Sequence, residues 1–202
     1  MKVDRFKAQV NSMARTNRFN LAMFGTGGAV SGLRMRGLHC TTAVMPGRGF
    51  MTKTPIDYGP RRTVPTMPQY DAFDCTFRLE NHYEDRELLE KWQEAVFSPA
   101  PDFYMNYLDD YKGIIYLEQV DHYSQVTYRG VMVDAWPMQI GVSTFSADSS
   151  NEIQTVTGQF NYRFWFSEFT NSKPDTFLGG ILQKFGKKLG RKITSKLEDV
   201  VF

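Results

Sequence analysis

The sequence predicts a mainly β protein with one α-helix against its body and helical extensions at its ends. Two segments, Phe73 to Leu79 and Ile153 to Phe166, alternate apolar and polar residues as half-buried strands do. One segment of the body, Glu84 to Phe97, has helical periodicity instead. With 202 residues and 42% hydrophobic content, the chain is long enough for one domain with a sizeable core.

The N-terminal residues are expected to form an arm outside the main domain. Val3, Phe6, Val10 and Met13 recur at intervals of three and four, which predicts a short amphipathic helix ending before Asn17. The arm lacks the apolar block of roughly 7–15 residues that a secretory signal needs. No stretch of the sequence approaches the ~20 apolar residues of a membrane span. We therefore expect a soluble protein made in the cytoplasm.

Two strands are expected after the arm. Phe19, Leu21 and Met23 alternate with other residues before the glycine-rich Gly25–Gly28, which predicts a strand followed by a turn. The glycines invite a phosphate-loop interpretation, but the Gly-Lys-Ser/Thr ending and the following helix of such a loop are missing. A second strand is predicted from Leu33 to Val44, where a proline–glycine pair follows.

The segment from Gly47 to Gln69 is rich in proline and glycine and is expected to be a long loop or a splayed hairpin. In a compact domain a loop of this length is usually functional or disordered. Its basic residues are Arg48, Lys53, Arg61 and Arg62.

The predicted helix from Glu84 to Phe97 places its large apolar residues on one face and acidic residues in its first turn, where the helix dipole favours them. An aromatic, acidic loop follows. Two strands are then predicted, Gly113 to Val120 and Gln125 to Val133, and Trp136-Pro137 is expected to break the second. Ile153 to Phe166 is expected to be one long strand, with a core-facing side and a wet side.

The segment from Asp175 to Phe202 contains six Lys or Arg and three Asp or Glu, in a chain whose net charge is +2. Apolar residues at helical spacing predict a basic amphipathic helix, which its glycines weaken by about 1 kcal/mol each. Three interpretations stay open: docking on a partner subunit, a loosely ordered C-terminal segment, and binding to a membrane surface or nucleic acid. The basic residues expected to dock are Lys184, Lys187, Lys188, Arg191 and Lys192.

No catalytic residue, metal ligand or cofactor is predicted. His39, His82 and His122 lack metal-binding spacings, and neighbours on a strand point to opposite faces, so His39 does not activate Cys40. Cys40 and Cys75 are too few for a disulfide framework and are expected to be buried thiols, although a bridge between neighbouring strands stays open.

Two further features argue against a catalytic acid pair and against general nucleic-acid binding. The adjacent acids Asp109 and Asp110 are expected to be solvated. The charge outside the basic C-terminal segment is close to neutral, which argues against a general nucleic-acid binder.

Several motifs resemble the tail tube proteins of contractile-tailed (T4-like) bacteriophages, and the resemblance covers about Arg18 to Phe166. The motifs are Arg18-Phe-Asn-Leu21, Cys40-Thr-Thr-Ala-Val-Met-Pro46, the Asp71–Phe77 strand leading to the Trp92 helix, Tyr128-Arg-Gly-Val with Ala135-Trp-Pro137, and Ser150-Asn-Glu-Ile-Gln-Thr155.

The resemblance implies a tail-tube-like, two-sheet β-sandwich over residues 18–170, between the arm 1–17 and the extension 171–202. It implies hexameric rings stacked into the tail tube of a virion, the conduit for DNA ejection. The implied partners are other copies of the chain, the tail sheath protein, the tape-measure protein and baseplate or tail-terminator proteins. DNA is expected to pass through the lumen without specific binding, and no membrane is involved.

The predicted loop from Gly47 to Gln69 matches the position of this family's inter-ring stacking element. Arg48, Lys53, Arg61 and Arg62 are therefore candidates for contacts with the adjacent ring. Two alternatives stay open. A tube-initiator, tube-terminator or baseplate tube-like protein shares the fold, and a membrane- or nucleic-acid-binding module would act through the basic C-terminal segment.

Overall fold

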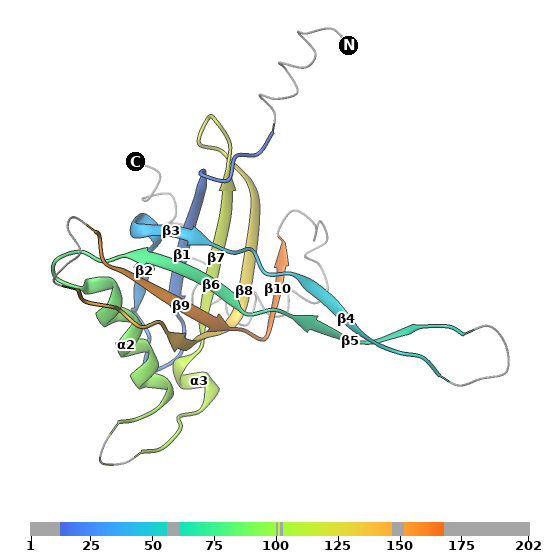
Figure 1. Ribbon diagram of the computed structural model, residues 1–202. Coiled ribbons are helices and arrows are strands. Elements are labelled where there is room, and N and C mark those ends of the chain that lie inside the picture. Colours follow the sequence, from blue (N-terminus) through green and yellow to red (C-terminus); the bar gives the residue numbers. More distant parts are fainter. Residues whose placement is uncertain (1–12, 56–60, 100, 102, 147–151, 168–202) are drawn as a thin grey trace, which may run out of the picture. The chain divides into compact units, whose positions relative to one another are not determined.

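The computed structural model describes residues 13–55, 61–99, 101, 103–146 and 152–167, and Figure 1 shows their arrangement. The elements are β1 (Phe19–Gly25), β2 (Arg34–Arg36), the 3₁₀ turn η1 (Gly37–His39), β3 (Cys40–Ala43), β4 (Arg48–Lys53), β5 (Val64–Tyr70), β6 (Phe73–Arg78), α2 (Glu84–Val96), α3 (Leu108–Tyr111), β7 (Gly113–Val120), β8 (Val126–Ile140), β9 (Thr155–Asn161) and β10 (Phe164–Ser167). The predicted mainly β class with a flanking helix is confirmed. The helix expected within residues 1–15 falls largely, and the extension 171–202 entirely, outside the described residues.

The strands form two antiparallel layers joined by β8. One layer contains β2, β1, β7, the first part of β8 and β10, and the other contains the last part of β8, β9, β6 and β3. Figure 1 shows β1, β7 and β8 running together while β3, β6 and β9 cross them. This arrangement is the two-sheet sandwich that the family resemblance implies, with a core between the layers.

Large apolar side chains from both layers fill the core. The fully buried ones are Met23, Met35, Phe73, Phe77, Leu89, Trp92, Ile115, Met132, Val156 and Phe160. Burial of each such side chain stabilises the fold by roughly 1.5–3 kcal/mol. The alternation of apolar and polar residues predicted the buried face of β6 correctly, because Phe73, Cys75 and Phe77 all point inward.

The helix α2 packs through the apolar face that its sequence predicts. Leu89 and Trp92 are fully buried, and the Trp92 ring centre lies 5.7 Å from that of Phe160. The Trp92 indole N–H donates to the Tyr111 carbonyl at 2.7 Å. At Gly113, a Cβ would lie 2.4 Å from the Trp92 ring, so the start of β7 leaves room for the indole only because it is glycine.

The prediction of a single strand from Leu33 to Val44 is wrong. β2 ends at Arg36 and pairs with β1, η1 intervenes, and β3 begins at Cys40 and pairs with β6 in the other layer. At Gly37 a Cβ would lie 2.5 Å from the Leu21 Cβ. The chain therefore turns closely past β1 as it crosses between the layers.

The break predicted at Trp136-Pro137 is also wrong, because β8 continues to Ile140. The proline cannot donate a ladder hydrogen bond, but it lies next to a register shift between Pro137 and Gln139, a position where strands tolerate proline. β8 bends instead at Asp134, which has φ 55° and is the extra residue of a bulge opposite Gly113 and Ile114.

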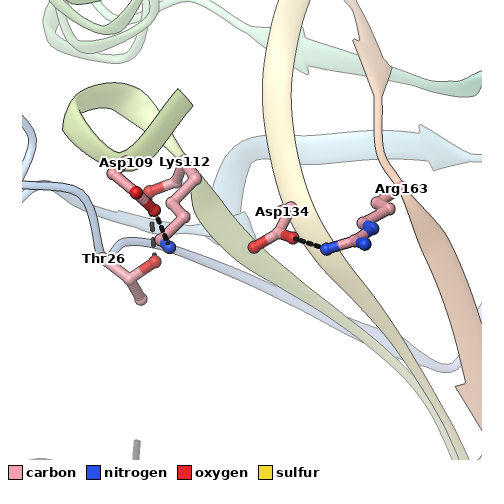
Figure 2. Close-up of polar contacts among 5 residues, drawn as sticks. All are labelled: Thr26, Asp109, Lys112, Asp134 and Arg163. Carbon is pink, nitrogen blue, oxygen red and sulfur yellow. Dashed lines mark hydrogen bonds and ion pairs between the residues drawn. The ribbon is translucent and has the colours of Figure 1, made fainter. Parts of the chain in front are cut away.

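The long strand predicted from Ile153 to Phe166 is in fact two strands. β9 ends at Asn161 and pairs with β6, whereas β10 begins at Phe164 and pairs with β8. The corner between them lies against the β8 bulge, where the Arg163 amide donates to the Val133 carbonyl at 3.0 Å. The Arg163 guanidinium lies 3.6 Å from the Asp134 carboxylate, as Figure 2 shows. Both chain segments thus change layer at the same place.

The helices are short. Within the described residues, no helix has the length and apolar character needed to cross a membrane.

Candidate assembly interface

The segment predicted to be a long loop or a splayed hairpin is a hairpin of β4 and β5. The two strands form a sheet of their own, with Arg48 opposite Tyr70 at the base and Lys53 opposite Val64 at the far end. Every described residue from Arg48 to Gln69 is exposed. A two-stranded hairpin is at best marginally stable in water unless something packs against it.

The hairpin exposes large apolar side chains on both of its faces. These are Phe50, Met51, Val64 and Met67. Phe50 and Met51 are neighbours on β4 and so point to opposite faces, and Met51 lies across from Met67. Clustered exposed apolar side chains mark interaction sites on soluble proteins.

The base of the hairpin is fixed to β10 by Arg48. Its guanidinium donates to the Trp165 carbonyl at 2.8 Å and lies over the rings of Trp165 and Tyr70, at 4.6 Å and 5.9 Å from their centres. The Trp165 indole N–H donates to the Gly47 carbonyl at 3.4 Å. Cation–π contacts of this kind contribute roughly 0.5–2 kcal/mol. Arg48 therefore has partners within its own chain.

The four basic residues predicted for inter-ring contacts separate into two groups. Arg48 lies at the base of the hairpin, whereas Lys53 ends β4 and Arg61 and Arg62 precede β5 at the same far end. The structure thus brings Lys53, Arg61 and Arg62 to one end and places Arg48 elsewhere. The five basic residues expected to dock from the C-terminal extension lie outside the described residues.

A second exposed apolar surface lies in the connection between α2 and α3, which sequence reasoning described only as an aromatic, acidic loop. We call its large side chains the connection patch: Phe97, Phe103, Tyr104, Met105, Tyr107 and Leu108. They are 40% to 83% exposed. The signal in the sequence was the density of aromatic residues, which by itself does not separate a buried segment from an exposed one.

Hydrogen bonds order the backbone of the connection patch. The Ser98 amide donates to the Tyr104 carbonyl at 3.0 Å, and the Asn106 amide donates to the Val96 carbonyl at 3.0 Å. The ring centres of Phe97 and Phe103 lie 6.2 Å apart. The patch is therefore a formed surface at the end of α2.

The glycine-rich turn after β1 holds α3 in place. The amides of residues 26–29 donate to the carbonyls of Asp109, Asp110 and Lys112 at 2.8–3.2 Å. Figure 2 shows the Thr26 hydroxyl bonded to the Lys112 carbonyl and the Lys112 ammonium bonded to the Asp109 carboxylate. That ammonium lowers the pKa of the exposed Asp109. The prediction of a turn is confirmed, and its amides are already occupied by protein carbonyls.

His39 joins η1 to α2 and to the end of β6. Its Nδ1 lies 2.8 Å from the Asp85 carboxylate and its Nε2 lies 2.9 Å from the Glu80 carboxylate. The hydrogen bond to Asp85 is the main cause of a raised His39 pKa. The position fits a structural histidine.

Cys40 and Cys75 are both free thiols, on the neighbouring strands β3 and β6. Cys75 is buried, as predicted, and Cys40 is only half-buried. Burial raises the pKa of Cys40 to about 11 and raises that of Cys75 further. Both groups are therefore protonated near neutral pH and are poor nucleophiles. The described residues contain no group of three or more His, Cys, Asp or Glu placed to hold a metal ion.

A family model described as phage tail tube protein matches residues 14–168, which include every strand and helix described above. The chain belongs to the phage tail tube protein family. The family resemblance found in the sequence is confirmed. No curated protein matches this chain in sequence.

Solved structures show the same fold as this tail tube protein. The anti-feeding prophage baseplate matches with a TM-score of 0.60 and 8% identity, over 77% of this chain and 95% of the other. The cap that terminates the anti-feeding prophage tube matches with a TM-score of 0.57 and 16% identity, over 77% of this chain and 91% of the other. A chain of the sheath–tube complex of an extracellular contractile injection system matches with a TM-score of 0.54 and 14% identity, over 81% of this chain and 96% of the other. At these identities the likeness concerns the fold alone.

Proposed function

We propose that this tail tube protein is a structural subunit whose hexameric rings stack into the tube of a phage tail, the conduit for DNA ejection. The observation that carries the proposal is the β4–β5 hairpin, whose described residues from Arg48 to Gln69 are all exposed. A second ring packed on the hairpin would cover its apolar side chains and remove the cost of exposing them.

Ring closure is supported by the ends of the two layers. The edge strands are β2 and β10 in one layer, and β3 and the last part of β8 in the other. A terminal strand presents unpaired backbone groups, which pairing with a neighbouring copy would satisfy. A closed ring of such pairings leaves no free edge.

The proposed role is assembly and conduction, with no catalysis. In the virion the expected partners are further copies, the sheath, the tape-measure protein and the baseplate or terminator proteins. DNA would pass without specific binding, because an acidic lumen repels phosphate and a neutral lumen does not attract it. The inter-ring role of Lys53, Arg61 and Arg62 and the docking of the extension 171–202 are parts of this proposal.

A tube-initiator, tube-terminator or baseplate protein is the second candidate. It is favoured by the likeness to a baseplate structure and to a tube-terminating cap, beside the likeness to a sheath–tube complex. Such a protein occupies one ring in each particle, whereas a tube subunit occupies many. Quantitative mass spectrometry of purified tails, with a sheath protein as the internal standard, separates the two.

The proposal is tested by negative-stain electron microscopy of the purified full chain at rising concentration, together with tail particles that contain it. Six-fold rings and stacked tubes are expected. A double variant, Phe50→Ser with Met67→Ser, is expected to keep rings and lose stacking, because it removes apolar side chains from the hairpin alone. A chain that stays monomeric, with no such ring in tail particles, contradicts the proposal.

A further inference from the structure

We propose that the connection patch of one copy receives the β4–β5 hairpin of a second copy in the adjacent ring. This inference rests on the proposed function and deepens it, since it names the surface that covers the hairpin. Hairpin and patch are different surfaces of one chain, so each copy gives one and receives the other. A heterologous contact can repeat from one ring to the next without closing on itself, as stacked rings require.

The two surfaces match in apolar character. The hairpin exposes Phe50, Met51, Val64 and Met67, and the patch exposes six large side chains that include Phe103 and Met105. Aromatic residues and methionine are enriched in the buried centres of protein interfaces. Each surface alone leaves apolar area in water, and their contact buries both.

The two surfaces carry opposite charge. The hairpin segment, residues 48–70, contains four Lys or Arg and one acid, Asp57. Residues 94–112 contain four acids, Glu94, Asp102, Asp109 and Asp110, and one base, Lys112, which is bonded to Asp109. Lys53, Arg61 and Arg62 lie at the far end of the hairpin, where they can meet these acids. Complementary charge of this kind selects the partner and fixes its register.

Hydrogen bonds within the chain hold the described residues of the patch in place. The Asn106 side-chain amide donates to the Ala95 carbonyl at 2.9 Å, in addition to the backbone bonds that span the connection. The turn at residues 26–29 holds the α3 end of the patch. Binding to a preorganised surface avoids the entropic cost of ordering it.

A competing acceptor lies between the end of β8 and the start of β9. It exposes Met138, Val142, Phe145 and Ile153, and residues 141–154 contain two acids, Asp148 and Glu152, against four in residues 94–112. The charge of the hairpin therefore favours the connection patch, and the test includes this second surface as an outcome.

The first experiment reverses the charges. Arg61→Glu with Arg62→Glu, and separately Glu94→Lys with Asp110→Lys, are each expected to reduce the sedimenting tube fraction of the full chain by about tenfold or more, because like charges then face each other. All four changes in one chain are expected to restore tubes. Restoration supports the proposal, and failure to restore in folded protein overturns it.

The second experiment uses exposed positions and so does not depend on the reversal variants folding. In a Cys40→Ser chain, Met67→Cys with Tyr104→Cys is expected to form disulfides between copies under mild oxidation of assembled tubes. Met67→Cys with Ile153→Cys is the matched control for the competing acceptor. If tubes form and only the control pair cross-links, the inference is overturned and the proposed function stands. Failure of the unmodified chain to form rings or tubes overturns both.

Discussion

The guanidinium of Arg48 lies 4.6 Å from the centre of the Trp165 ring and donates a hydrogen bond to the Trp165 carbonyl at 2.8 Å. The two residues are 117 positions apart in the sequence. Their contact ties the base of the exposed β4–β5 hairpin to β10. Since the rest of the hairpin has no core of its own, this contact fixes where the hairpin leaves the sandwich.

Replacing Arg48 with alanine should loosen the hairpin in the isolated protein. We expect faster hydrogen exchange at the β4 amides and a loss of about 1–2 kcal/mol in unfolding free energy, because the cation–π contacts and a charged hydrogen bond are removed together. Hydrogen exchange followed by mass spectrometry measures the effect. Lys53→Ala is the control, since Lys53 is exposed at the far end. Equal protection in both variants would contradict the role of Arg48.

Thermal stability should fall as the pH rises past neutrality, because of His39. A neutral imidazole has one N–H, so hydrogen bonds from both ring nitrogens to the carboxylates of Asp85 and Glu80 require the protonated form. The His39 pKa is raised in the fold by Asp85 first and by the charges of Glu80 and Glu84. The stabilisation is therefore complete below the unfolded pKa of about 6.5 and is lost as the pH rises through the raised folded pKa.

Melting temperatures between about pH 6 and pH 8.5 test this sign, above the range where carboxylates titrate. His39→Gln should flatten the dependence, and His122→Gln should not. The effect should be small, because the His39 side chain is 37% exposed and solvent screens its ion pairs. A titration of the His39 ring by NMR with a pKa below 6.5 would refute the argument.

Gly113→Ala adds only a methyl group but should destabilise the fold strongly. The added methyl would lie 2.4 Å from the Trp92 ring, which is fully buried. Overpacking of this kind costs about 1–3 kcal/mol. Urea denaturation measures the change. Gly49→Ala in the hairpin is the matched control, because its new methyl would meet nothing nearer than 4.0 Å.

Asp134 should tolerate asparagine and reject valine. Its φ of 55° is a conformation that Asn adopts readily and β-branched residues avoid. Asp134→Asn loses only the 3.6 Å pair with the exposed Arg163, worth up to about 1 kcal/mol. Asp134→Val adds backbone strain of about 1–2 kcal/mol or more. Denaturation curves that place the two variants at equal stability would argue against the bulge as the bend of β8.

Of the two surfaces of the candidate interface, the sequence predicted only the hairpin segment. The proline, glycine and basic residues between Gly47 and Gln69 predicted an unusual exposed segment, and the structure made it a hairpin. The connection patch was not predicted as a surface. An aromatic run such as Phe103 to Leu108 has the same composition whether it is buried or exposed, and exposure depends on what packs against it.

The sequence by itself determined the mainly β class, the family and the elements whose periodicity is local, such as α2 and β6. Only the tertiary structure decided where the chain changes layer: at η1, at Asp134 and at the Asn161–Phe164 corner. The reason is that alternation records whether a side chain faces the core, and both layers face the same core. Val156, Phe160 and Tyr162 are all buried as the chain approaches the corner, so the pattern carries no mark of the change of sheet.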